Sequence, residues 1–413
     1  MKRCTIINSE NFWNNSVRNS MSSVVTVINK IWTRNYIFVC LASLIAGTMH
    51  MLNLATLPMY AIILGGNSFT MGLVTSVYFV AALCTRPLIG KLLDQKGRKI
   101  ILLLGIGTIT MACLFYEWAA NVWILLGLRF LNGIGYSMMT TAAATAIADL
   151  VPPTRLAEGI GYYSLTLTIS IALGPALGLN LIAWGGYKSV FICLTGLGLL
   201  SFFILSLVDY EKDLIKSTRL IDKKVALMER SALPMASVML LIALGISGIL
   251  TFLPTYSIER HIENISLFYL FYALAMLIPR AFLGRVVDRY GGDLVILPAI
   301  IVQGTCLLLL AFGHSFVIIT IAALCFGIGF GALQPTINSM ILKKASAARR
   351  GAANATFLTM SDIGFCLGTA LWGYLVGAKG FTFIYCASAG CIVTAYIIYL
   401  GIKHTTRADK SIA

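Results

Sequence analysis

The chain alternates between long apolar stretches and short polar breaks. We count twelve mostly apolar stretches of about 20 residues, the length that an α-helix needs to cross a bilayer. They are residues 36–60, 69–90, 99–118, 122–147, 159–183, 188–208, 233–257, 265–285, 294–313, 315–340, 352–376 and 381–402. The longest break, residues 209–232, holds eleven charged residues and separates six stretches from six. This pattern predicts an all-α membrane protein with twelve transmembrane helices in two six-helix bundles.

Composition excludes most soluble classes. Of the 413 residues, 58% are hydrophobic and only 11% are charged, and the mean hydropathy is +0.87. A soluble domain carries about 25% charged residues, so this chain lacks the side chains to cover a surface in water. A soluble enzyme, a disordered protein and a disulfide scaffold are therefore not expected.

Positive charge indicates how the chain lies in the membrane. The net charge is +15, which in a soluble protein would suggest nucleic-acid binding. Here an N-terminus placed inside puts 27 of the 31 Lys and Arg residues in inside segments. Outside loops then hold only Lys188, Arg260 and Lys379, and Arg129 lies within a stretch. Because cytoplasmic loops of membrane proteins are rich in Lys and Arg, we expect an inner-membrane protein with both termini cytoplasmic and no nucleic-acid partner.

The breaks also divide the chain into segments. We expect a cytoplasmic N-terminal segment 1–35, a bundle 36–208, a cytoplasmic linker 209–232, a bundle 233–402 and a cytoplasmic tail 403–413. The first segment is mostly polar and lacks the apolar core of a signal peptide. Met21 is an alternative start to Met1.

No cofactor, metal site or catalytic motif is expected. The ten cysteines contain no CxxC pair and mostly lie inside apolar stretches, where they are read as small packing residues. A P-loop, an HExxH motif and a GxSxG motif are absent from the sequence, so neither ATP-driven pumping nor hydrolysis is supported.

The two halves repeat one another at an offset of 194 residues. Matched pairs are Arg86 and Arg280, Gly90 and Gly284, Asp94 and Asp288, Gly97 and Gly291, Gly133 and Gly327, Gly135 and Gly329, Arg155 and Arg349, and Gly174 and Gly368. Two parallel six-span repeats are typical of transporters whose substrate cavity lies between the halves near the membrane midplane.

The loop after the second stretch reads GKLLDQKGRK at 90–99. It resembles the G-x-L-x-D-R-x-G-R-K motif of the major facilitator superfamily, and within it the twelve-span drug:proton antiporters, although Gln95 replaces the first Arg. The resemblance implies a latch that holds the halves in the outward-open state, with Gly90 allowing helix approach. A topogenic basic loop is the alternative. The latch candidates are Gly90, Asp94, Gly97, Arg98 and Lys99, their second-half counterparts Gly284, Asp288 and Arg289, and Asp149.

Two further motifs carry the resemblance. LRFLNGIG at 128–135 is similar to the family pattern R-x-x-Q-G-x-G, with Asn132 in place of Gln. Arg129 costs about 2.5–3.5 kcal/mol at a helix centre; the family implies a part in proton coupling, and pairing with backbone carbonyls alone is the alternative. LGPALG at 173–178 is similar to the antiporter motif G-x-x-x-G-P-x-x-G-G, which favours export. We expect hinge or packing roles for Gly133, Gly135, Gly174, Pro175 and Gly178, the last three at the interface between the halves.

Asp362 is the boldest candidate for a proton site. It is the one carboxylate deep inside a predicted span, and its repeat counterpart is Thr168. Burial disfavours the charged form, so Asp362 could load and release a proton near neutrality; pairing with a neighbouring hydroxyl or Arg is the alternative. His50, with Asn53 one turn away, is the other buried titratable candidate, and plain packing is its alternative reading.

Together these features predict a monomeric secondary transporter that exchanges protons for a small organic molecule across the lipid bilayer. The cargo would be a drug-like compound or a secreted metabolite such as a metallophore. A proton-coupled uptake symporter or facilitator for a nutrient is the alternative. An intramembrane enzyme would need convergent His, Asp or Ser groups, and only His50 and Asp362 are available, so the chain is not expected to be an enzyme.

Overall fold

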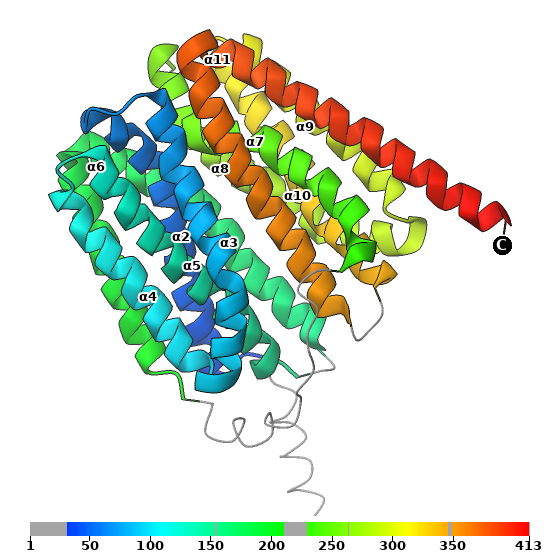
Figure 1. Ribbon diagram of the computed structural model, residues 1–413, viewed down its shortest axis with the longest axis horizontal. Helices are drawn as coiled ribbons and strands as arrows, with labels where there is room; N and C mark the ends of the chain where they lie inside the picture. Colours follow the sequence, from blue (N-terminus) through cyan, green and yellow to red (C-terminus); the bar gives the residue numbers. More distant parts are fainter. Residues whose placement is uncertain (1–30, 153–154, 210–228, 263, 346–348, 413) are drawn as a thin grey trace, which may run out of the picture.

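The computed structural model describes residues 31–152, 155–209, 229–262, 264–345 and 349–412, and within these ranges it is helical with no strand (Figure 1). The first half contains α2 (Arg34–Ile63), α3 (Ser68–Lys96), α4 (Arg98–Phe115), α5 (Val122–Leu150) and α6 (Leu156–Ser206). The second half contains α7 (Leu233–Glu259), α8 (Ser266–Tyr290), α9 (Asp293–Phe312), α10 (Phe316–Lys344) and α11 (Arg350–Ile412). Short 3-10 helices at Tyr116–Trp118 and Arg230–Ala232 complete the described elements.

Two of these helices each contain two spans. The dihedral angles of α6 leave the helical region at Gly185 and Gly186, and those of α11 leave it at Gly380. Gly186 (φ 67°) and Gly380 (φ 77°) occupy the left-handed region that favours glycine, and they are 194 residues apart. With α6 and α11 divided there, each half has six helical spans, as predicted.

Hydropathy agrees with this count. In the described part of the chain, nine helices are long and apolar enough to cross a bilayer, α6 and α11 each counted once. Residues Ser266–Arg280 of α8 form a further, shorter apolar helix. The prediction of a twelve-helix membrane protein is thus confirmed.

Polar side chains set the helix starts. Asn67, Asn121 and Ser315 each accept a hydrogen bond from a backbone N–H in the first turn of the helix that follows, which satisfies groups that have no intrahelical partner. At the other end of the first bundle, the Asn35 side-chain amide donates to the Asp209 carbonyl (3.1 Å) and its oxygen accepts from the Asp209 N–H (3.2 Å). The start of α2 and the end of α6 therefore lie together, away from Ser68.

Glycines allow the helices within each half to approach closely. A Cβ at Gly133 would lie 2.3 Å from the Tyr78 carbonyl oxygen, and one at its counterpart Gly327 would lie 2.4 Å from the Tyr272 oxygen. Tyr78 and Tyr272 are also 194 residues apart, so the same crossing of helices occurs in both halves. A Cβ at Gly135 would likewise lie 2.7 Å from the Gly105 carbonyl oxygen. The predicted packing roles of Gly133 and Gly135 agree with this geometry.

The Gly-Pro motif packs elsewhere than expected. A Cβ at Gly174 would lie 2.7 Å from the Leu52 nitrogen, and one at Gly178 would lie 2.7 Å from Thr56 Cγ2, so both glycines face α2 of their own half. The expectation of an interface between the halves is wrong for these residues. Small residues signal a close approach, but they do not say which helix approaches. Helix α6 continues through Pro175 without leaving the helical region there.

The two halves meet mainly through α3 with α11, α6 with α8, and α2 with α7; α3 and α11 run side by side in Figure 1. Near the Ser68 end, a Cβ at Gly72 of α3 would lie 2.2 Å from the Thr369 carbonyl oxygen of α11. Ser76 Oγ lies 2.7 Å from Thr369 Oγ1 and donates to the Cys366 carbonyl (2.9 Å). Backbone-to-backbone contact thus closes the halves together at this end.

Candidate functional site

Arg129 is fully buried inside the first half and makes only neutral contacts among the described residues. Its Nε donates to the Val74 carbonyl of α3 (3.0 Å), and its Nη1 donates to Asn132 Oδ1 (3.4 Å). The guanidinium carbon lies 4.4 Å from the centre of the Tyr78 ring. Nη2 has no hydrogen-bond partner in the part of the chain that the structure describes. A permanent charge is therefore held by a carbonyl, an amide and an aromatic face.

His50 and Asn53 lie beside Arg129. The imidazole stacks on the rings of Tyr78 (4.9 Å) and Tyr136 (4.5 Å), whose own centres are 5.2 Å apart, so the three rings form a compact triangle. The Asn53 and Asn132 amides both donate to Cys113 Sγ, at 3.8 and 3.7 Å. We call these residues the Arg129 cluster: His50, Asn53, Tyr78, Cys113, Arg129, Asn132 and Tyr136. The structure thus brings three of the predicted site residues together, with Tyr78, Tyr136 and Cys113 as neighbours that the sequence analysis did not single out.

Several polar atoms of the Arg129 cluster are buried without a partner. Besides Arg129 Nη2 they include His50 Nδ1, Asn53 Oδ1 and the Tyr78 hydroxyl, counted over the described residues. A buried polar group without a hydrogen bond costs free energy, and each such group in a native protein calls for an explanation. Their clustering in one place is what a site for a polar ligand, water or a proton would require.

Asp362 lies at the contact between the halves and faces a cation that the sequence analysis overlooked. Arg86 Nη2 of α3 lies 2.9 Å from Asp362 Oδ2 of α11, and the two side chains are 21% and 12% exposed. Arg86 Nε and Asp362 Oδ2 nevertheless lack a hydrogen-bond partner of good geometry among the described residues. The charges are at ion-pair distance without the aligned N–H···O bonds that would hold them firmly. Of the readings left open for Asp362, pairing with an Arg is the one observed.

Arg280, the repeat counterpart of Arg86, also lies at the contact between the halves. From α8 its Nη1 donates to Thr168 Oγ1 and to the Ser164 carbonyl (3.4 Å), both on α6. Its Nη2 donates to Gln334 Oε1 of α10 (3.5 Å). Thr168 is the repeat counterpart of Asp362, so the two arginines occupy equivalent positions and face equivalent residues across the two interfaces.

The sequence analysis assigned Arg86 and Arg280 to cytoplasmic loops, and this assignment is wrong. Both lie inside helices, on the faces that meet the other half. The signal was present, because both fall within the predicted spans 69–90 and 265–285 and match at the repeat offset. The positions of the two arginines inside the spans were missed because every cation near a span end was counted as a loop charge.

Aromatic side chains connect Asp362 with the Arg129 cluster. The Tyr78 ring lies perpendicular to the ring of Phe79, with centres 5.3 Å apart. Phe79 stacks on Phe365 of α11 with ring centres 5.3 Å apart, and it lies perpendicular to the His50 ring at 6.4 Å. Ring contacts therefore join the predicted site residues: the Arg129 cluster, with His50 and Asn53, lies inside the first half, and Asp362 lies where this half meets the second.

The described contacts of the latch motif stay within the first half. Arg98 Nε binds Asp149 Oδ2 at 2.9 Å, which joins the start of α4 to the end of α5. Lys99 Nζ donates to the Ser206 carbonyl at 2.9 Å. Gly97, at φ 87°, and its counterpart Gly291, at φ 89°, end α3 and α8 in the left-handed region. A latch between the halves stays a prediction.

The structure gives less information on the other latch candidates. A Cβ at Gly90 would meet no atom of the described residues within 4 Å, so the close helix approach expected there stays a prediction. In the second half, Arg289 lies over its neighbour's ring, Tyr290, at 5.3 Å. The side chains of Asp94 and Asp288 and the surroundings of Gly284 lie outside what the structure describes.

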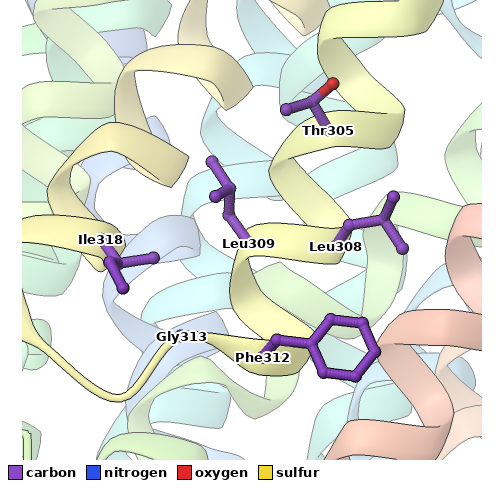
Figure 2. A pocket seen from close by; sticks show the side chains of 6 residues that line it. All are labelled: Thr305, Leu308, Leu309, Phe312, Gly313 and Ile318. Carbon is purple, nitrogen blue, oxygen red and sulfur yellow. The ribbon is translucent and has the colours of Figure 1, made fainter.

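A separate hollow lies on the surface between α9 and α10 (Figure 2). Its volume is about 300 Å³, and it is lined by Thr305, Leu308, Leu309, Phe312, Gly313 and Ile318. Because it has no titratable side chain and Phe312 and Leu308 are exposed, it is suited to lipid rather than to a coupled cargo. Over the described residues, no group of three His, Cys, Asp or Glu side chains could hold a metal ion.

Comparison with known proteins agrees with this architecture. The sequence profile of the Major Facilitator Superfamily matches residues 39–369 and 265–411. The multidrug resistance protein MdtG of Klebsiella pneumoniae is 27% identical over 395 residues, covering 90% of this chain and 94% of the relative. The multi-drug resistance efflux pump PmrA homolog of Lactococcus lactis is 26% identical over 376 residues, covering 83% and 89%.

Among solved structures, the nucleoside transporter NupG (D323A mutant) superposes with a TM-score of 0.73 at 15% identity, covering 89% of this chain and 99% of NupG. At this identity the likeness establishes the fold alone. The profile match, however, spans nearly the whole chain, and the two relatives are matched over 89% and 94% of their own lengths. The chain belongs to the Major Facilitator Superfamily and is an integral membrane transporter, not an enzyme.

Proposed function

We propose that this transporter exports a small organic molecule in exchange for protons, and that Asp362 carries the proton. The observation that carries this proposal is the Arg86–Asp362 contact. Among the described side chains, Asp362 is the carboxylate far from any helix end, and its partner belongs to the other half. Because the Asp362 carboxylate attracts Arg86 of the other half, neutralising this carboxylate would weaken the contact between the halves.

The physical step is simple. While Asp362 is ionised, it attracts Arg86 in surroundings that screen charge poorly, and the halves stay together along α3 and α11. Removing one partner of a buried ion pair typically costs about 3–5 kcal/mol. Protonation neutralises Asp362 and withdraws this attraction, so the strength of the contact between α3 and α11 depends on the proton. The unaligned geometry of the pair supports a contact that forms and breaks during the cycle.

The proposed direction of transport follows from two supports. The relatives bear the names of multidrug efflux proteins, and the Gly-Pro motif resembles that of antiporters. With both termini cytoplasmic, as the positive charges predict, a proton would enter from outside and cargo would load from the cytoplasm. Each proton that moves down 100 mV supplies about 2.3 kcal/mol, or on the order of a fifty-fold gradient of cargo.

The Arg129 cluster is proposed to complete the pathway. Its unpartnered atoms, His50 Nδ1, Asn53 Oδ1 and Arg129 Nη2, offer hydrogen-bond acceptors and a donor next to the Tyr78 and Tyr136 rings. These groups would bind a polar part of the cargo, or water that carries the proton toward Asp362.

Purified protein in proteoliposomes with an internal pH dye tests this proposal. A panel of drug-like compounds is added, and compound-driven proton flux is recorded for the parent and for Asp362→Asn. Glu117→Gln is the matched control, because Glu117 pairs with Lys188 at an exposed turn (3.5 Å). We expect proton flux to disappear in Asp362→Asn and to persist in the control. Equal flux in all three proteins would refute the assignment of Asp362, and cargo uptake against the predicted direction in oriented vesicles would favour the symporter alternative.

A further inference from the structure

The two repeat-related arginines at the contacts between the halves have different partners. Arg86 faces a carboxylate, Asp362, whereas Arg280 faces the hydroxyl of Thr168 at the equivalent position. Its other described acceptors, the Ser164 carbonyl and Gln334 Oε1, are also neutral and lie at 3.4 and 3.5 Å. Among the described residues, one of the two equivalent contacts between the halves thus pairs its arginine with a carboxylate and the other does not.

Arg280 retains unused hydrogen-bonding capacity. A guanidinium has five N–H donors and cannot lose its charge in a protein. The described contacts use Nη1 twice and Nη2 once, so Nε and one N–H of Nη2 have no acceptor in the described ranges. Unlike Arg129, which is fully buried, Arg280 keeps part of its surface exposed.

The balance of charged side chains within the bundle also favours an anionic ligand. Well away from the helix ends, the described side chains include three arginines, Arg86, Arg129 and Arg280, against one carboxylate, Asp362. A desolvated cation that contacts only neutral groups is poorly compensated. An oxyanion forms charge-assisted and often bidentate bonds with guanidinium, which are about twice as strong as bonds between neutral groups.

We propose that the contact between α6 and α8 is a binding site for an anionic group of the cargo, a carboxylate or phosphate, with Arg280 as its charged ligand. This inference rests on the proposed transport function and specifies its substrate class. Thr168 and Gln334 would orient the oxyanion, and because Arg280 belongs to the second half and Thr168 to the first, a bound anion would contact both halves at once. The same oxyanion chemistry occurs in anionic lipid headgroups, so the experiment must separate the two sources.

Binding to the purified protein tests the proposal without requiring transport. Naphthalene-2-carboxylate, 2-naphthylmethanol and 2-naphthylmethylammonium share one ring system and differ in charge. Their affinities are measured from the shift in melting temperature in phosphatidylcholine nanodiscs. Arg280→Gln removes the cation, whereas Thr168→Asp places a carboxylate opposite it, as Asp362 stands opposite Arg86. Lys188→Gln is the control, since it makes the same change in net charge at an exposed position.

We expect the carboxylate to bind at least tenfold more tightly than the alcohol or the ammonium compound. Arg280→Gln and Thr168→Asp should both lose this preference, and Lys188→Gln should keep it. Thr168→Asp keeps the cation and supplies it with a partner, so a loss of anion binding in a protein that still melts cooperatively separates the site from a folding defect. A parent without preference for the anion, or a preference that survives Thr168→Asp, would overturn the proposal.

The lipid source is tested by adding phosphatidylglycerol to the nanodiscs. Naphthalenecarboxylate binding should be unaffected; if the lipid abolishes it in an Arg280-dependent manner, a headgroup occupies the site and the cargo assignment is overturned. Since the readout is binding to the resting protein, a failure of proton coupling at Asp362 would leave these results intact, and a failure here would leave the Asp362 test intact.

Discussion

Replacing Gly72 by Ala should shift the conformational equilibrium of the transporter. In the present structure the new Cβ would lie 2.2 Å from the Thr369 carbonyl oxygen, 3.1 Å from the Thr369 carbonyl carbon and 3.2 Å from Gly373 Cα. All three atoms belong to the backbone of α11 in the other half, so no side chain can rotate away. The two helices must separate by about 1 Å to restore van der Waals contact.

The size of the effect follows from the cost of overpacking, which is typically 1–3 kcal/mol. The cost applies only while α3 and α11 touch at the Ser68 end, so any state with this end open is spared. Since 1.4 kcal/mol is a factor of ten in an equilibrium constant, the closed state should lose about 5- to 150-fold in relative population. Gly127→Ala is the matched control, because a Cβ at Gly127 would meet no atom of the described residues within 4 Å and the gain in helix propensity is the same.

Spin labels at positions 69 and 374 measure this shift. The Phe69 and Tyr374 rings lie on opposite sides of the contact with their centres 6.4 Å apart. In Gly72→Ala the short-distance population should shrink, and a longer one should grow. An unchanged distance distribution in a folded Gly72→Ala protein would refute the claim that backbone contact at Gly72 closes this end.

Four further predictions follow from the site and the topology. Asp362→Glu should keep partial proton-driven transport with a shifted pH optimum, which a pH series of flux in proteoliposomes will show; loss equal to that in Asp362→Asn would contradict it. Arg129→Ala should abolish coupled transport, and undiminished proton-driven efflux would show that the Arg129 cluster is structural. A reporter fused after residue 220 should read out cytoplasmic, and a periplasmic signal would overturn the topology. Hydrogen bonds from the Ser231 side chain and backbone hold the pKa of Glu229 below its usual range. The stabilisation that Glu229 provides should therefore be complete above about pH 4.5 and be lost as the pH falls below that value. A Glu229→Gln variant that loses as much thermal stability on acidification as the parent does would disprove this.

The overall architecture was readable from the sequence because its causes are local or periodic. Apolar length predicts each span, and the recurrence of Arg86, Gly133 and Gly174 at one offset predicts the two equivalent halves. Even the left-handed glycines that end α3 and α8 recur at that offset. His50 was expected to be buried and Arg129 to lie within a span; both are buried, and with Asn53 they lie in one cluster.

The partners of these residues were not readable, because they depend on how helices distant in sequence are placed. Asp362 was selected for its burial, but its pairing with Arg86 requires α3 to lie beside α11. Gly174 was expected between the halves and instead packs on α2, since a small residue carries no information about which helix it meets. Arg280 was counted as a loop charge because the rule for positive loops treats all cations near a span end alike.

The connections at Gly185–Gly186 and Gly380 have a mechanical consequence. Each joins two spans with no flexible loop, so each pair of spans forms a stiff hairpin that should move as one lever. In α11 the first arm of the lever carries Asp362, and the second arm is fixed at its far end, where Tyr399 donates a hydrogen bond to Asp293 and Lys403 pairs with it at 3.1 Å. In α6 the first arm carries Thr168, and the second is fixed by Lys99, the repeat counterpart of Asp293, bound to Ser206. A displacement of the first arm of α11 that follows protonation of Asp362 would therefore also move the second arm, including Tyr399 and Lys403 beyond Gly380, and with it the start of α9 at Asp293.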